Sequence, residues 1–507
     1  MKNETIAPKH RVEISPVMHE LASYISKAGK RPLPKPVAEK TKHHVLDTIA
    51  AMVSGSRLLP GQKAISYIKT QGGVAESTVI GSRIVTSAEN AALANGMLAH
   101  ADETDDSHAP SLTHPGCGIV PAALAMAERE QSNGTSFLRA VALGYDVGCR
   151  LTMALHPHEF REAGHSTHTF GPMWGAAAAA GSLAGLKYDQ TRYLLSYVAQ
   201  QSSGVSCWMR DAEHIEKAFD FGGMPARNGV AAAAMVAHGF SGVEDVFSGE
   251  RNFFVAYDES GRIGKAPQPE RLIEGLGETF EVVNTNIKRW SVGSPIQAPL
   301  DGLLELIRTH NIKPDDVKKL VVRVSHQGAN TVNNRDMPDI CLQHLCAVML
   351  IDGIITFESA HDEKRMKDRK VLDVRSRIEL HGDDALTRAM PSRQGIIEVT
   401  LNNRKTLRLH VKAVRGTSDN PMTRAEVDEK SYHLLEPILG KKRARLLCDT
   451  VWTLEDVSSM RNLRAKMVAY CAIDEKGQRI FSDADAIEIG EARADVIDRL
   501  FGVAQRL

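Results

Sequence analysis

Net charge, paired cysteines and long apolar runs are all missing from this chain of 507 residues. Its 62 basic residues balance 62 acidic ones, which removes the electrostatic argument for a nucleic-acid partner or an anionic membrane surface. The seven cysteines include no Cys-x-x-Cys pair, so neither a disulfide framework nor a thiolate zinc site is predicted, and a reducing compartment is expected. This composition favours a small-molecule partner.

Two further absences concern membranes and phosphate groups. The N-terminal residues MKNETIAPKHRVEISP contain no apolar signal-peptide core, and the most apolar later tract, GAAAAAGSLAGL, is far shorter than the ~20 residues that span a bilayer. We therefore expect a soluble, cytoplasmic protein without membrane contact. Neither G-x-G-x-x-G nor G-x-x-x-x-G-K-[ST] occurs between a strand and a helix, so the glycines of residues 171–185 are expected to serve helix packing.

Alanine-rich helical patterns dominate what is present. Because the chain exceeds the roughly 250 to 300 residues of a single hydrophobic core, two domains are expected. Small side chains allow helices to approach closely, so residues 15–283 are predicted to form a large all-α domain. Its predicted helices are PVAEKTKHHVLDTIAAMVSG, TSAENAALANGMLAH, GIVPAALAMAERE, SFLRAVALGYDVGCRLTMAL, GPMWGAAAAAGSLAGL, DQTRYLLSYVAQQSS and NGVAAAAMVAHG.

Residues 284–414 show a different pattern. The segment KLVVRVS at Lys319–Ser325 is β-branched, and apolar and polar residues alternate on both sides of the turn 402–405, which predicts a strand and a hairpin. The apolar segment CLQHLCAVMLIDGIITF is predicted to be a helix packed on this sheet, giving an α+β domain. Helical pattern resumes in residues 415–507, which are expected to rejoin the first domain. The predicted fold is therefore mainly α with an inserted α+β domain.

The densest group of titratable side chains lies in the stretch HADETDDSHAPSLTHPGCGIVP, residues 100–121. It holds four carboxylates and three histidines within a few turns of chain. Thr86 and Glu89 have capping-box spacing at the start of the preceding helix, so the cluster is expected at the C-terminal end of that helix. The macrodipole disfavours acids there, so helix stability does not explain the cluster and chemistry is predicted. Crowding is expected to raise the pKa of at least one of these carboxylates.

Four separated segments resemble the MmgE/PrpD family, which includes 2-methylcitrate dehydratase, cis-aconitate decarboxylase and iminodisuccinate epimerase. They are HADETDDSHAPSLTHPGCGIVPAALA, AGHSTHTFGPMWGAAAAA, IKRW from Ile287 and RGTSDNPMT from Arg415, and they occur in matching order. The resemblance implies a large all-α domain, a smaller α+β lid domain and a homodimer. It also implies a cofactor-independent site between the domains that takes a small di- or tricarboxylate.

The resemblance also implies four catalytic residues. His114 occupies the histidine of the family's T-H-P segment, and His165 occupies the histidine before its G-A-A-A helix. Lys217 and Lys288 match the two active-site lysines of the family, although the spacing after Gly222 is one residue longer here.

Four further residues are expected to bind the substrate: Asp102, Glu103, Ser107 and His344. The last three stand where decarboxylase-like members have aspartate, threonine and tyrosine. These departures are expected to reshape the pocket, so the substrate of no named member carries over to this chain.

The side chains themselves suggest the chemistry. Lysines and histidines in a water-poor cleft stabilise an aci-carboxylate-like intermediate, an effect worth roughly 3 to 4 kcal/mol per donor in other enzymes. His114 or His165 is predicted to move the proton, and Glu103 is a candidate acid for a departing hydroxyl. The predicted function is a cofactor-independent lyase that abstracts a proton alpha to a carboxylate. Dehydration, as in 2-methylcitrate dehydratase, is preferred over decarboxylation and epimerisation.

The D-E-T-D-D cluster leaves a metal-dependent enzyme open as an alternative. Hard carboxylates suit Mg²⁺, and imidazole with carboxylate suits transition metals. No second acidic motif lies on a later predicted helix, and an aromatic content of 5% leaves little to line a carbocation cavity. No metal site is therefore predicted, and Cys117 is expected to be buried and inert.

Overall fold

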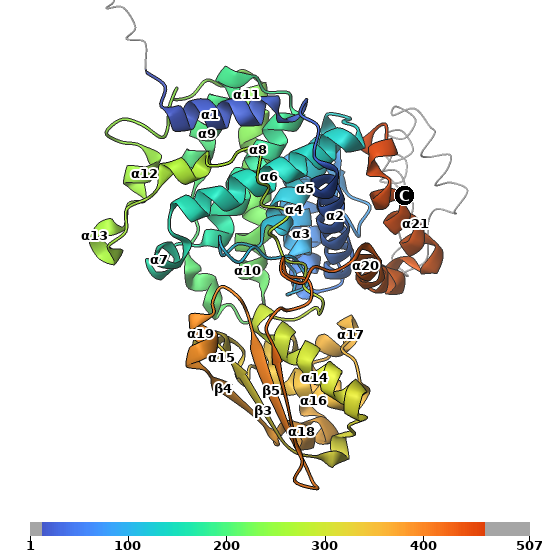
Figure 1. The fold of residues 1–507 in the computed structure, drawn as a ribbon. Helices are drawn as coiled ribbons and strands as arrows, with labels where there is room; N and C mark the ends of the chain where they lie inside the picture. Colours follow the sequence, from blue (N-terminus) through green and yellow to red (C-terminus); the bar gives the residue numbers. More distant parts are fainter. Residues whose placement is uncertain (1–12, 462–507) are drawn as a thin grey trace, which may run out of the picture.

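Helices form the larger part of the molecule, which Figure 1 shows above a smaller part built on a sheet. The computed structural model describes residues 13–461. The helices of the larger part are α1 (Pro16–Ala28), α2 (Lys35–Gly55), α3 (Leu59–Ile68), α4 (Ala88–Ala99), α5 (Pro115–Arg129), α6 (Gly134–Ala154), α7 (Pro157–Glu162), α8 (Thr167–Leu183), α9 (Tyr188–Gln201), α10 (Ile215–Ala218), α11 (Met224–Ala237), α12 (Phe253–Ala256), α13 (Ser260–Ile263), α20 (Arg424–Leu439) and α21 (Lys441–Trp452). All seven helices predicted from the alanine-rich segments are present.

Helix α8 lies at the centre of the helical part, against α5, α6 and α11. Glycines bring α6 and α8 together. A Cβ atom on Gly148 would lie 2.5 Å from the carbonyl oxygen of Gly171, and one on Gly175 would lie 2.4 Å from that of Gly144. Such contacts are shorter than any real side chain makes, so these positions need glycine. The prediction that glycines of this segment serve helix packing is confirmed at Gly171 and Gly175.

The smaller part contains a mixed sheet of β3 (Val317–Val324), β4 (Ile378–Gly382), β5 (Gly395–Leu401) and β6 (Thr406–Val411) in the order β4-β3-β5-β6. The pair β3/β4 is parallel and the other pairs are antiparallel, so the predicted strand and hairpin are confirmed. Its helices are α14 (Gln297–His310), α15 (His326–Val332), α16 (Leu342–Asp352), α17 (Phe357–Ala360), α18 (Arg369–Arg375) and α19 (Asp384–Arg388). Helix α14 contacts β5 and β6, and α16 contacts β4, as predicted for the apolar helix.

The two parts have separate apolar cores. One core includes residues from Met18 to Ile287 and again from Met422 to Met460, and the other includes residues from Trp290 to Leu407. The chain returns to the helical part after the sheet, where α20 packs on α2. The fold is therefore mainly α with a small mixed sheet. Of the predicted helical segment 415–507, residues 462–507 lie outside the described residues. Within the described residues, every helix is too short or too polar to cross a bilayer.

The predicted capping box at Thr86 and Glu89 is wrong by one residue. Helix α4 begins after Ser87, whose side chain accepts a hydrogen bond from the backbone N–H of Asn90. Thr86 instead belongs to β2 (Val85–Thr86), which pairs with β1 (Ser77–Thr78). This pairing holds its backbone in an extended conformation. The far end of α4 is at Ala99, so the acidic stretch follows a helix C-terminus as predicted.

Candidate active site

A cavity of about 610 Å³ is lined by residues from both parts of the fold. The helical part contributes the loop between α4 and α5, the start of α8, and α10 with the turn that follows it. The sheet part contributes α15 and the loop before β5. Glu103, His114 and Lys217 line this cavity, and Lys288 lines an adjoining cavity of about 300 Å³. Ser107 lines both, so these predicted residues converge on one region.

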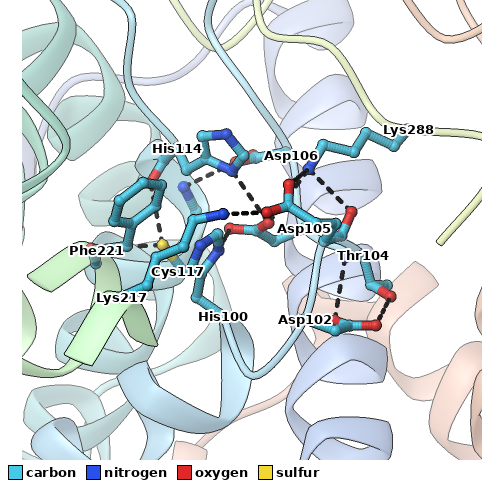
Figure 2. Close-up of polar contacts among 12 residues, drawn as sticks. His100, Asp102, Thr104, Asp105, Asp106, His114, Cys117, Lys217, Phe221 and Lys288 are labelled. Carbon is cyan, nitrogen blue, oxygen red and sulfur yellow. Dashed lines mark hydrogen bonds and ion pairs between the residues drawn. The ribbon is translucent and has the colours of Figure 1, made fainter. Parts of the chain in front are cut away.

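Asp105 orders two of the histidines in this region. The Nδ1–H groups of His100 and His114 donate hydrogen bonds of 2.9 and 3.0 Å to its two carboxylate oxygens (Figure 2). A carboxylate at Nδ1 fixes the tautomer and leaves Nε2 of each ring as the acceptor nitrogen. Burial lowers the pKa of His114 to about 4, so its ring is neutral near pH 7. Burial alone would raise the pKa of Asp105, but the two imidazoles hold it well below its usual range.

Glu103 pairs with both predicted lysines. Figure 2 shows the two lysine side chains reaching the acidic loop from opposite sides. Lys217 Nζ donates to Glu103 Oε1, and Lys288 Nζ lies 3.3 Å from Oε2 and 2.9 Å from the Glu103 carbonyl oxygen. Lys288 Nζ is also 3.7 Å from Asp105 Oδ1. Burial would lower the pKa of Lys288, but the carboxylates of Glu103 and Asp105 raise it, so this lysine stays charged.

The pKa values of Glu103 and Asp105 are lowered, whereas crowding within the acidic stretch was expected to raise a carboxylate pKa. Burial would raise the pKa of Glu103, but the charges of Lys217 and Lys288 outweigh burial and hold it well below its usual range. The expectation that Glu103 stays protonated to act as an acid is therefore wrong. The sequence could not show this because the two lysines come from distant segments.

Lys217 owes its position to an irregular helix. It lies on α10, which continues into the π-helical turn η2 (Phe219–Gly223) and then into α11. A π-turn accommodates one extra residue in a helix, so the chain widens locally between Lys217 and α11. A Cβ atom on Gly222 would lie 2.1 Å from the carbonyl oxygen of Gly96, so glycine lets this turn touch α4. The lysine Nζ lies 5.3 Å from the ring centroid of Phe221.

Asp106 anchors the acidic loop to the helical core rather than facing the cavity. Its carboxylate accepts hydrogen bonds from His44 Nδ1 at 2.7 Å, from the Tyr145 hydroxyl at 2.5 Å and from the backbone N–H of Gly116 at 2.9 Å. These partners belong to α2, α6 and α5. The loop is thus held by several helices, which gives Glu103 and Asp105 fixed positions.

His165 is not brought into the cavity. Its ring stacks on Phe160 with centroids 4.2 Å apart, and its Nε2 lies 3.0 Å from a carboxylate oxygen of Glu259. His168 lines the cavity instead, with its ring stacked on Phe221 at 3.8 Å. Because α8 begins at Thr167, His165 precedes the helix and His168 lies in its first turn. Sequence reasoning missed His168, although it follows His165 by one helical turn in the same motif.

Of the remaining predicted binding residues, Ser107 is held by backbone pairing and His344 does not line either cavity. The Ser107 N–H donates a hydrogen bond of 2.9 Å to the carbonyl oxygen of Asn286, two residues before Lys288. His344 lies on α16 within the sheet part, fully buried, and contributes to neither cavity wall. Neither of its ring nitrogens has a hydrogen-bond partner among the described residues, and burial lowers its pKa to about 4.

Asp102 joins the acidic loop to the sheet part of the molecule. Its carboxylate forms an ion pair with His361 Nε2 at 2.9 Å, and it accepts hydrogen bonds from the backbone N–H and hydroxyl of Thr104. Burial would lower the pKa of His361, but Asp102 and Asp339 raise it to about 9. Asp102 does not line the cavity. Its contacts indicate that it positions the loop.

This ion pair predicts a pH-dependent stability. Because the folded-state pKa of His361 lies above its ordinary value of about 6.5, the pair stabilises fully below pH 6.5 and the contribution is lost as pH rises through about 9. The shift corresponds to at most about 3 kcal/mol. Denaturant unfolding of wild type should therefore show a falling free energy of unfolding from pH 6.5 to 9.5, and Asp102→Asn should flatten it. The exposed pair His326–Asp384 offers the control, because Asp384→Asn should leave the pH profile unchanged.

Two sets of buried side chains bring potential metal ligands within 4.8 Å of one another: His100, Asp105 and Cys117, and His100, Glu103 and His214. Burial raises the pKa of the Cys117 thiol well above its usual value, so a thiolate ligand is disfavoured. Glu103 is already neutralised by two ammonium groups, which would repel a divalent cation. The protonated thiol and the two ammonium groups therefore disfavour a metal ion at these described residues.

The sequence comparisons agree with this arrangement of two parts. Residues 19–264 match the MmgE/PrpD N-terminal domain and residues 290–455 match the MmgE/PrpD C-terminal domain, so the chain belongs to the MmgE/PrpD family. A cis-aconitate decarboxylase-like protein of Aspergillus oryzae is 24% identical over 479 residues, covering 89% of this chain and 96% of that protein. A cis-aconitate decarboxylase of Aspergillus terreus is 24% identical over 308 residues, covering 58% of this chain and 61% of the decarboxylase.

Proposed function

We propose that this chain is a lyase that acts on a small di- or tricarboxylate without a cofactor, by removing a proton alpha to a carboxylate. The observation that carries the proposal is the position of His114. It is a neutral, buried imidazole oriented by Asp105, on a cavity wall that also presents Lys217 and Glu103, and Glu103 is paired with Lys288.

His114 is the proposed base. Its Nδ1–H is bound to Asp105, so Nε2 carries the lone pair that accepts the substrate proton. The ionised carboxylate of Asp105 then stabilises the imidazolium that forms. Lys217 and Lys288 place positive charge where the aci-carboxylate develops, and the low-dielectric surroundings make that charge effective.

Dehydration is the first candidate reaction. The alpha C–H proton passes to His114, the beta C–O bond breaks, and the departing hydroxide takes a proton from the Lys217 ammonium and leaves as water. This sequence needs a neutral base, which His114 provides. Dehydration of a 2-methylcitrate-like hydroxy acid is the specific form that we propose.

Decarboxylation is the second candidate, and the names of the two Aspergillus relatives favour it. In that reaction CO₂ leaves first, the same lysines stabilise the carbanion, and a proton donor quenches it. Epimerisation shares the first intermediate, so the beta substituent of the substrate separates the three outcomes.

Isotope exchange tests the proposal. We expect that at least one member of a panel of hydroxylated and unsaturated di- and tricarboxylic acids takes up deuterium alpha to a carboxylate in D₂O, followed by NMR. The exchange should persist after exhaustive chelation, since no step uses a metal. If exchange is lost on chelation and restored by Mg²⁺ or a transition metal, the metal-dependent alternative is correct. Absence of exchange and of net conversion across the panel would contradict the proposed function.

A further inference from the structure

The lysine and carboxylate cluster has no net charge. Lys217 and Lys288 carry two positive charges, and Glu103 and Asp105 carry two negative ones. The imidazole of His114 is neutral near pH 7. A doubly or triply charged anion that entered the cavity would therefore meet no excess of positive charge from these groups. Additional cations are required to hold it.

Two arginines supply that charge. Arg161 lies on α7 in the helical part and Arg393 lies in the loop before β5 in the sheet part, and both line the cavity of about 610 Å³. Among the described residues, neither guanidinium forms an ion pair with a carboxylate. The side-chain contacts of Arg161 are a 3.9 Å approach of Nη2 to Met209 Sδ and the ring of Trp208 at 5.9 Å.

The acidic groups of the wall already have other partners. Glu103, whose charge raises the pKa of Arg393, is paired with Lys217 and Lys288. The two carboxylate oxygens of Asp211 accept the backbone N–H groups of Glu213 and Lys217, at 2.9 Å each. Arg335 also lines the cavity, but its side chain is exposed to solvent.

An unpaired guanidinium inside a protein is unfavourable, and a carboxylate is its natural partner. Burial lowers the pKa of both Arg161 and Arg393, and the charge of Arg161 lowers that of Arg393 further, so the two cations lie close enough to repel. Guanidinium groups nevertheless remain charged in proteins. A carboxylate between them would relieve the repulsion and the cost of burial, and would gain charge-assisted hydrogen bonds.

We propose that Arg161 and Arg393 form a subsite for a substrate carboxylate that is remote from the reacting carbon, so that the site selects acids with at least two carboxylates. The inference rests on the proposed function for the identity of the reacting end. Because one arginine comes from each part of the fold, the bound carboxylate also bridges the helical part and the sheet part.

Binding of tricarballylate, propane-1,2,3-tricarboxylate, tests the subsite without turnover, because this acid has neither a leaving group nor a double bond. Isothermal titration should give a Kd at least tenfold weaker for Arg161→Gln and for Arg393→Gln than for wild type. The matched control is Arg388→Gln, which removes an exposed charge on α19 outside the cavity and should keep the Kd within twofold. The Kd of propionate, which has one carboxylate, should change less than threefold in all variants.

Folding is checked by thermal unfolding, where both cavity variants should melt at or above the wild-type temperature, because a half-buried charge without a carboxylate partner has been removed. Tricarballylate binding that is equal in wild type and both cavity variants would overturn the subsite, as would failure of tricarballylate to bind wild type. Neither result affects the proposed function, which fails only if the acid panel shows no exchange and no conversion.

Discussion

His114→Gln is expected to lower kcat by about two to three orders of magnitude while the protein stays folded. Glutamine keeps a polar side chain near Asp105 but cannot accept the substrate proton, and loss of a general base costs 10²- to 10⁴-fold. In wild type, kcat should not fall on acidification through pH 6.5, because burial holds the pKa of His114 at about 4. Steady-state rates between pH 5 and 8 with the reactive acid measure both effects.

His165→Gln is the matched control for this prediction. His165 also matches a family motif, but its ring lies against Phe160 and Glu259 outside the cavity wall. We expect His165→Gln to keep kcat within about fivefold of wild type. A large loss in His165→Gln with normal turnover in His114→Gln would show that the base has been misassigned.

Elements of the fold could be predicted from the sequence where the local residue pattern determines the secondary structure. Alanine-rich helices and the hairpin around residues 402–405 are set by periodicity and turn residues, and the structure has them at the predicted places. Strand β4 was missed, because its parallel pairing with β3 depends on contacts between distant segments. The cap at Ser87 was misplaced for a similar reason, since pairing of β2 with β1 occupies Thr86.

Site residues could be predicted from the sequence only where a family motif contains them. His114, Lys217, Lys288 and Glu103 were selected by the family resemblance, and the structure brings them together. The ionised state of Glu103 could not be predicted, because it depends on cations from distant positions.

No motif or pattern in the sequence identifies Arg161 and Arg393 as cavity residues. Arg161 lies on the six-residue helix α7 and Arg393 in a loop, and an arginine in either place is usually solvated. Only the folded structure shows that both face one cavity without a carboxylate partner. His168 differs, because its place one helical turn beyond His165 was a signal that could have been used.

Lys288→Met is expected to lower kcat/KM by about two to three orders of magnitude and also to destabilise the protein. Methionine has a similar length without the charge, so the electrostatic stabilisation of the aci-carboxylate is lost. Glu103 and Asp105 also lose a buried counter-ion, and breaking such a pair costs about 3 to 5 kcal/mol. Activity should therefore be measured at a temperature where thermal unfolding shows the variant to be folded.

Lys430→Met separates the two effects of losing a buried lysine. Lys430 Nζ lies 2.5 Å from an Asp47 carboxylate oxygen and 3.0 Å from the carbonyl oxygen of Thr104 in the same acidic loop, but it does not line the cavity. Its replacement should lower the melting temperature to a similar extent and leave kcat/KM within about tenfold of wild type. If Lys288→Met, folded at the assay temperature, loses no more activity than Lys430→Met, the positive charge of Lys288 has no part in the chemistry and its role is to hold Glu103 and Asp105 in place.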